Sequence, residues 1–179
     1  MDKKQIRREM RRLEEELAAS GSAALRSEEI FRQVEALPEF RTARTILAYM
    51  SLPGEAQTPA AIKRWAESRR IAIPRVEGEQ LRLCLYEDDK LVSGYKGILE
   101  PSANAAIISA EEVDLAIIPG VAFERRGDGI VRLGHGKGFY DRLLPQLSCK
   151  KIGVGFSFRL TEGIPSDPWD VLLDDLITA

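Results

Sequence analysis

Residues 45–73 read TILAYMSLPGEAQTPAAIKRWAESRRIAI, and their pattern indicates the class of fold. It opens with Thr45 to Met50, a short apolar run between polar flanks that is typical of a buried strand. It closes with a second apolar run, Ile71 to Ile73. A helical pattern fills the residues between the two runs. A strand, helix, strand unit of this kind favours a parallel sheet with a right-handed crossover.

The middle of this stretch carries the signals of a loop and then of a helix. Ser51 to Glu55 (SLPGE) is typical of a loop. Thr58 followed by Pro59 indicates a helix start, with Thr58 as the cap and Pro59 at the first helical position. The pattern predicts that this helix runs to Arg69 or Arg70.

Two amphipathic helices are expected before the first strand. The first ends near Ser20 and Gly21, and its apolar residues recur at helical spacing: Ile6, Met10, Leu13 and Leu17. Ser27, followed by two glutamates, is expected to start the second helix, and Pro38 to stop it.

Four more strand patterns follow along the chain. Leu81 to Leu85 alternates apolar and polar residues, which indicates a strand near an edge of the sheet that need not be parallel. The others are Asp114 to Ile118, Lys151 to Phe158, and Val171 to Ile177 as a last edge strand. A short helix is expected from about Phe139 to Leu144.

Length and composition fit one domain with one core. The chain has 179 residues, of which 44% are hydrophobic and 30% charged, as in ordinary globular proteins. With the elements above, this predicts a three-layer α/β/α single domain over residues 1–179, with a mostly parallel sheet and two N-terminal helices. Ligands of such sheets bind at the carboxyl ends of strands, which points to the loops after Met50 and Ile118.

Charge and cysteine usage argue against several classes of function. The net charge is −2 and both signs are interspersed, so we expect no binding to nucleic acid or to a membrane surface. Cys84 and Cys149 lie far apart without neighbouring ligands, so neither a disulfide nor a cysteine metal site is expected. Met1 to Arg12 lacks the apolar run of a secretory signal, and no stretch approaches the roughly 20 apolar residues of a membrane span. We expect a cytoplasmic monomer.

The chemistry is concentrated in RLGHGKGFYDR, residues 132–142, within a polar stretch (124–138) that we expect to be an active-site loop. Glycines at alternate positions let successive amide groups face an anion, and the start of the next helix adds partial positive charge. Lys137 and Arg132 add full charges, and Asp141 is suited to hold Mg²⁺ against nucleotide phosphates.

The motif matches neither a Walker A loop nor the G-x-G-x-x-G dinucleotide pattern. From the residues alone, a second interpretation stays open. The glycines could simply form a turn, and Asp141 could match the dipole of the helix that follows.

With PGVAF (residues 119–123) upstream, the motif resembles the signature of the 5-formyltetrahydrofolate cyclo-ligase family. Other segments resemble the family in the same order: KKQIRRE (3–9), AYMSLPGE (48–55), ILEP (98–101) and DVLLD (170–174). The resemblance covers nearly the whole chain. Two departures stand out, because Phe139 replaces the family's usual tyrosine and the loop from Phe123 to Arg132 is a few residues longer than usual.

The resemblance implies ATP-dependent cyclisation of 5-formyltetrahydrofolate to 5,10-methenyltetrahydrofolate, with release of ADP and phosphate. In that reaction the formyl oxygen attacks the γ-phosphate of ATP and gives a phosphorylated formyl (imino-phosphate) intermediate. The folate 10-nitrogen then attacks its carbon, and phosphate departs. The protein has mainly to position the partners and to neutralise phosphate charge.

The resemblance also implies the site residues. Lys137 and Arg132 are expected to be catalytic, and Asp141 with Asp167, or with Asp170 in its place, to bind Mg²⁺. The residues expected to bind ATP are Lys3, Lys4, Arg7, Arg132, Leu133, Gly134, His135, Gly136, Lys137, Gly138, Phe139 and Tyr140. Those expected to bind folate are Met50, Glu55, His135, Gly136, Lys137, Gly138 and Phe139.

Among the folate residues, the Glu55 carboxylate suits the amino and ring N–H groups of the pterin, and Met50 suits packing on its ring. His135 is the sole histidine, and we assign it no acid–base role.

Two other functions stay open from the sequence. One is a small-molecule kinase that uses the same anion site and releases a stable phosphorylated product. The other is a non-catalytic relative that binds folate or nucleotide, which Phe139 and the longer loop keep open. A dinucleotide oxidoreductase is disfavoured, because the glycine spacing and the acidic residue about 20 positions later are missing.

Overall fold

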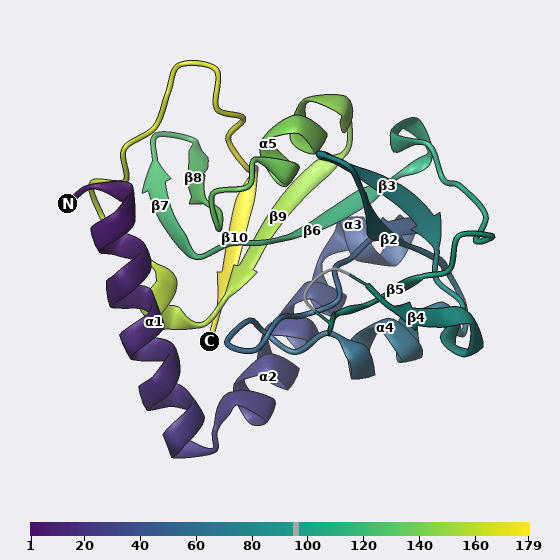
Figure 1. Cartoon of the computed structure of the whole chain (residues 1–179), viewed down its shortest axis with the longest axis horizontal. Coiled ribbons are helices and arrows are strands. Elements are labelled where there is room, and N and C mark those ends of the chain that lie inside the picture. Colours follow the sequence, from purple (N-terminus) through teal and green to yellow (C-terminus); the bar gives the residue numbers. More distant parts are fainter. Residues whose placement is uncertain (95–96) are drawn as a thin grey trace.

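The computed structural model describes residues 1–94 and 97–179 and has a mixed α/β fold (Figure 1). A six-stranded sheet with strand order β10-β9-β6-β1-β2-β3 forms its centre. Its strands are β1 (Thr45–Leu47), β2 (Arg70–Glu77), β3 (Gln80–Leu85), β6 (Leu115–Pro119), β9 (Lys150–Gly155) and β10 (Asp175–Thr178). All neighbours pair in parallel except β3, which is antiparallel to β2. The mostly parallel sheet and both predicted edge positions are confirmed, although the last strand begins at Asp175 and not at the predicted Val171.

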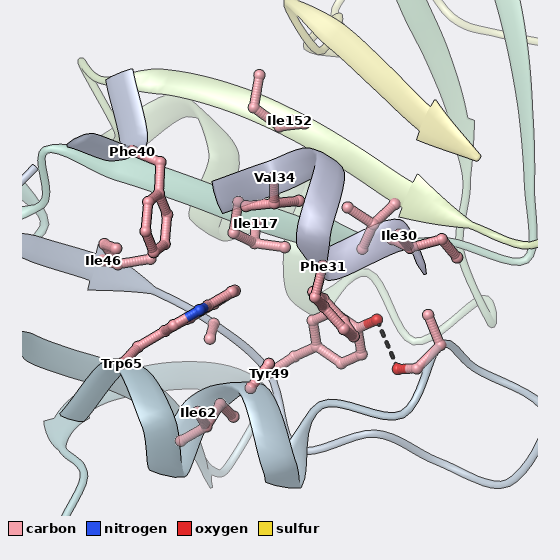
Figure 2. Packing of buried hydrophobic residues seen from close by; sticks show 14 of the residues in the cluster. Ile30, Phe31, Val34, Phe40, Ile46, Tyr49, Ile62, Trp65, Ile117 and Ile152 are labelled. Atoms are coloured by element: carbon pink, nitrogen blue, oxygen red, sulfur yellow. Dashed lines mark hydrogen bonds between the residues drawn. The ribbon is translucent and has the colours of Figure 1, made fainter. Parts of the chain in front are cut away.

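One face of the sheet is covered by three helices, α2 (Ala23–Ala36), α3 (Pro38–Thr42) and α4 (Pro59–Ala66). Figure 2 shows their side chains packed against those of the sheet. Trp65 lies edge-on to Phe31 and Phe40, with ring centroids 5.7 and 5.1 Å apart. Ile46 and Ile117 of the sheet are fully buried beneath them. Burial of this apolar surface is the main stabilising contribution to the fold.

The opposite face carries less helix. α5 (Phe139–Leu143) and a 3₁₀ turn, Leu144–Gln146, pack there against the sheet together with a β-hairpin. The hairpin consists of β7 (Ala122–Arg126) and β8 (Gly129–Leu133). The prediction of an active-site loop over residues 124–138 is therefore wrong for 124–133. Ile130 and Val131 are buried, and Gly127, with φ +59°, makes the turn between the strands.

α1 (Lys3–Ser20) packs on this hairpin through its first turns, whereas Leu17 near its end joins the main core, and Figure 1 shows the helix beside the hairpin. Its buried residues Ile6 and Met10 share a small core with Val131 of β8. A capping box fixes where the helix begins, because the Asp2 carboxylate accepts the Gln5 N–H at 2.7 Å and the Gln5 amide oxygen accepts the Asp2 N–H at 2.7 Å. The helix therefore presents its first turns next to the hairpin.

The start of α2 differs from the prediction. The helix begins at Ala23, one turn before the predicted start at Ser27. Ser27 is buried inside the helix, where its hydroxyl donates to Ala23 O at 2.7 Å and accepts the Gln57 N–H at 2.9 Å. Pro38 follows α2 as predicted, but it also begins α3.

The predicted helix start at Thr58 and Pro59 is confirmed, although not its capping bond. The Thr58 hydroxyl donates to Tyr49 O at 2.5 Å and accepts the Ser51 N–H at 3.1 Å, so it fixes the loop after β1 instead. α4 ends at Ala66, short of the predicted end, because the chain must reach β2.

A second hairpin beside β2 was not predicted. It is formed by β4 (Leu91–Ser93) and β5 (Leu99–Pro101), and β5 contains most of the ILEP segment. Further 3₁₀ turns lie at Asp88–Lys90, Ala110–Glu112 and Ser157–Arg159. Within the described ranges, no helix combines the length and the apolar character needed to cross a membrane.

Candidate active site

A cleft lies where the parallel strands β1 and β6 end, as the sheet topology predicts. Most of the predicted site residues line it: Lys3, Arg7, Met50, Glu55, Arg132, Leu133, Gly134, His135, Gly136, Lys137, Gly138, Phe139, Tyr140 and Asp141. Lys4 and Asp167 do not line it, and both are exposed. The cleft therefore joins α1, the loop after β1 and the glycine motif.

Arg132 is the buried cation of the cleft, with 7% of its side chain exposed. Its Nε donates to Pro119 O at 2.7 Å, and its guanidinium lies 4.8 Å from the centroid of the Tyr140 ring. Burial lowers the pKa of Arg132, while Tyr140 and Asp141 oppose that change, and an arginine remains charged in proteins. Its contact with the carboxylate of Asp141, from Nη1 to Oδ1, is long at 3.4 Å. An anionic ligand would therefore be attracted to this group.

The glycines of the motif let the chain pass close to charged side chains. Gly136 and Gly138 have φ of +95° and +70°, which other residues rarely adopt. A Cβ on Gly134 would lie 2.7 Å from the Arg132 guanidinium. Arg7 reaches the motif from α1, where its Nε donates to Gly134 O at 2.9 Å. Because α5 has only five residues, positive charge at this loop comes mainly from side chains rather than from the helix end.

Lys137 has a fixed backbone and an exposed side chain. Its carbonyl accepts from Arg142 Nη2 at 2.9 Å, and Arg142 Nε donates to Glu79 O at 2.7 Å, which joins the motif to the turn between β2 and β3. No side chain in the described part of the chain forms an ion pair with the Lys137 ammonium. This ammonium can therefore follow a charged ligand.

Glu55 is a buried carboxylate with one oxygen held by the protein. Its Oε2 accepts the Leu52 N–H at 2.9 Å, and the residue is 7% exposed. Its Oε1 lies 3.3 Å from His135 Nε2, and the side chain of His135 is 47% exposed. Glu55 therefore aims toward the glycine motif and can accept further N–H groups from a ligand.

The two predicted metal ligands do not lie together. Asp141 lines the cleft with 65% of its side chain exposed, whereas Asp167 lies outside it, 3.6 Å from Lys3 Nζ. Asp170, the alternative, does line the cleft and accepts the Asp167 N–H at 2.8 Å. In the described ranges no group of three or more His, Cys, Asp or Glu side chains is suited to a metal. A single carboxylate fits Mg²⁺ that takes its other ligands from phosphate and water.

One wall of the cleft was missed by sequence reasoning. It is mainly apolar and comes from β2, β3 and the segment around β5: Pro74, Val76, Leu81, Ile98 and Glu100. Glu100 is its buried carboxylate, at 8% exposed. Packing of the β4–β5 hairpin against β2, which pairs with β3, creates this wall. In the sequence, the local signal that points to it is the ILEP segment. A flat ring system would fit against such a surface.

Comparison with known proteins identifies the family of the chain. The model of the 5-formyltetrahydrofolate cyclo-ligase family matches residues 1–179. The 5-formyltetrahydrofolate cyclo-ligase of Haemophilus influenzae is 29% identical over 184 residues, which cover 98% of this chain and 96% of that protein. The probable 5-formyltetrahydrofolate cyclo-ligase of Caenorhabditis elegans is 31% identical over 198 residues, with 97% and 93% covered.

Two solved structures share the fold. The NMR structure of Aquifex aeolicus 5,10-methenyltetrahydrofolate synthetase has a TM-score of 0.86 at 32% identity, and the alignment covers 99% of this chain and 90% of that one. The Mycoplasma pneumoniae 5,10-methenyltetrahydrofolate synthetase has a TM-score of 0.79 at 25% identity, with 99% and 98% covered. The chain therefore belongs to the 5-formyltetrahydrofolate cyclo-ligase family of enzymes.

Proposed function

We propose that this chain catalyses the ATP-dependent cyclisation of 5-formyltetrahydrofolate to 5,10-methenyltetrahydrofolate, with release of ADP and phosphate. One observation carries the proposal beyond family membership. The cationic glycine motif, with Arg132 and Lys137, lines a single cleft together with a mainly apolar wall and the buried Glu55. A phosphate chain and a pterin ring need these two kinds of surface next to each other.

ATP is proposed to bind on the motif side. Lys3 and Arg7 lie one turn apart on α1 and line the cleft beside the glycines. Arg7 Nε donates to Gly134 O, and this hydrogen bond holds α1 against the motif. Lys4, exposed and outside the cleft, is the weakest of the proposed contacts.

The folate is proposed to bind between the motif and the apolar wall. Met50 and the wall residues would pack on the pterin ring, and Glu55 Oε1 would accept its amino and ring N–H groups. This arrangement directs the formyl group toward Lys137 and the phosphates. Phe139 lines the same region and needs no hydroxyl for that packing role.

In the proposed reaction the formyl oxygen attacks the γ-phosphorus and ADP leaves. The 10-nitrogen then attacks the formyl carbon, its proton is lost, and phosphate departs with the former formyl oxygen. Arg132 and Lys137 would neutralise the transferring group. Asp141 would hold Mg²⁺, which when bound supplies further positive charge to the phosphates. Cytoplasmic location and a monomeric state remain predictions.

The test is to mix the protein with 5-formyltetrahydrofolate, ATP and Mg²⁺, and to follow methenyltetrahydrofolate absorbance and phosphate release together. Lys137→Met should lower kcat at least about 100-fold, because a charge that stabilises the transition state is lost. The matched control is Lys63→Met, on the outer face of α4, where Lys63 pairs with Asp88. This control should retain full turnover.

The outcomes separate the alternatives. Equal amounts of methenyl product and phosphate support the cyclo-ligase assignment. A stable phosphorylated product without cyclisation would instead indicate a kinase. Ligand binding by correctly folded protein without either signal would indicate a binding protein and contradict the proposal.

A further inference from the structure

Arg159 is a buried arginine outside the cleft. It ends the 3₁₀ turn Ser157–Arg159, which follows β9, and is 1% exposed. Its Nε is a buried nitrogen with no hydrogen-bond partner among the described residues. Burying a cation, and leaving one of its donors unpaired, costs free energy that an apolar residue of similar size would avoid. The side chain therefore calls for an explanation other than general stability.

The guanidinium connects segments that are far apart in the sequence. Its Nη1 donates to Val121 O at 2.8 Å, in the loop between β6 and β7. Its Nη2 donates to Gly54 O at 2.5 Å, in the loop after β1, and to Glu14 Oε1 at 2.8 Å, on α1. Figure 1 shows the turn after β9 beside α1. One side chain thus joins both loops at the cleft to the helix that carries Arg7.

Each of these partners is close in sequence to a residue that lines the cleft. Gly54 directly precedes Glu55, and Val121 lies two residues after Pro119, whose carbonyl accepts from Arg132. Gly54 has φ +87°, and a Cβ there would lie 2.7 Å from Glu14 Oε2. The contact therefore requires glycine at this position. A shift of Gly54 O would move the Glu55 backbone directly.

We propose that Arg159 is a positioning residue that fixes the loop 51–55, and with it the Glu55 carboxylate, in the geometry that binds the substrate's ring N–H groups. Arg159 does not line the cleft, so it acts through Gly54 O and Val121 O. Its pairing with Glu14 keeps the guanidinium aimed at both carbonyls. The link to substrate rests on the proposed function, whereas the anchoring of the loop does not.

The first experiment measures anchoring without any ligand. Hydrogen–deuterium exchange of the free protein should be faster in Arg159→Met than in the wild type over 51–56 and 119–123. The matched control is Arg75→Met. Arg75 is 15% exposed and donates to Ser102 O and to the Glu77 carboxylate, but contacts neither loop. Arg75→Met should speed exchange near 102 and leave 51–56 unchanged.

The second experiment uses steady-state kinetics. Arg159→Met should raise KM for 5-formyltetrahydrofolate about tenfold, with a smaller change in KM for ATP. In a Glu55→Gln background the same substitution should raise KM for folate less than about twofold. The reason is that Glu55→Gln has already removed the carboxylate through which Arg159 acts. Arg159→Lys, which keeps the charge and one donor, should restore part of the affinity.

These results can fail separately. Unchanged exchange over 51–56 in Arg159→Met, or equal losses in wild-type and Glu55→Gln backgrounds, would overturn the positioning role and leave Arg159 as a purely structural group. If exchange rises as expected but wild-type protein makes no methenyl product, the anchoring of Glu55 is supported and the proposed function is contradicted.

Discussion

Gly138 and Gly21 adopt almost the same backbone conformation in different surroundings. Gly138 has φ +70° and ψ 9°, and Gly21 has φ +67° and ψ 8°. A Cβ on Gly21 meets no atom within 4 Å, whereas one on Gly138 lies 2.6 Å from Arg142 Nη1. Substitution of Gly21 therefore tests backbone strain alone, whereas substitution of Gly138 also disturbs the motif.

Alanine at either position should cost about 1–2 kcal/mol of unfolding free energy, because both residues are left-handed. Gly138→Ala should in addition displace Arg142, which holds the Lys137 carbonyl, and lower kcat about tenfold or more. Urea unfolding and turnover of both variants are the measurements. Equal turnover of Gly21→Ala and Gly138→Ala would show that the fixed backbone of Lys137 does not matter for catalysis.

The packing of α1 on the β7–β8 hairpin makes the proposed nucleotide contact of Arg7 depend on a small core. Ile6 is fully buried in it, one residue before Arg7. Ile6→Ala should cost about 2–4 kcal/mol of unfolding free energy and should weaken ATP binding more than folate binding. Leu25→Ala, on α2 and 78% exposed, is the control and should change stability by less than about 0.5 kcal/mol. Equal loss of both ligands in Ile6→Ala would argue against an ATP role for α1.

The same hairpin carries a carboxylate that makes its stability depend on pH. Burial alone would raise the pKa of Glu124, but the Arg126 guanidinium at 2.5 Å and the Ile164 N–H at 2.8 Å hold that pKa below its ordinary value of 4.5. A carboxylate whose pKa is lower in the folded state than in the unfolded state stabilises the fold at pH values above its unfolded-state pKa. This contribution is lost as pH falls through the folded-state pKa.

Glu124→Gln should therefore be less stable than wild type at about pH 7, and the difference should shrink as the pH falls below 4.5, the ordinary pKa of a glutamate. Urea unfolding of both proteins at a series of pH values measures this difference. Arg126→Gln, which removes the partner, should show the same convergence. Stability curves that stay parallel down to acid pH would show that Glu124 is not the group responsible.

The sequence predicted the elements whose signal is local and missed those that depend on distant contacts. The buried strands at Thr45 and Leu115 follow from their apolar runs, and the first helix from its spacing. β7 and β8 read as a loop because Glu124 to Arg126 is charged. These residues form ion pairs at the surface of a strand whose other residues are buried. β4 and β5 are too short to be predicted from periodicity.

The candidate site divides in the same way. The positions of Lys137, Lys3 and Arg7 at the cleft were predicted, because each belongs to a run of consecutive residues that resembles the family. Val76, Ile98 and Arg159 were not, because each reaches its place through pairing or packing of strands distant in sequence. Asp167 and Asp170 differ by three positions, and only the turn between them decides which one meets the cleft.

The complete fold should respond to nucleotide, because the proposed ATP contacts come from α1, the hairpin base and α5 at once. α1 shares a hydrophobic cluster with the hairpin, whereas α5 belongs to another cluster, and a bound ATP would bridge the two. A ligand at about 100 times its Kd adds about 2.7 kcal/mol to unfolding free energy, which raises Tm by roughly 5–10 °C in a chain of this size.

We therefore expect ATP with Mg²⁺ to raise Tm by this amount in wild-type protein, and ATP with a chelator to raise it less. Asp141→Asn should lose the difference between these two conditions, since Asp141 is the proposed metal ligand in the cleft. Lys63→Asn is the control, because it changes an exposed charge on α4. An undiminished effect of Mg²⁺ in Asp141→Asn would show that another carboxylate binds the metal. Asp170 would then be the next to test, because it lines the same cleft.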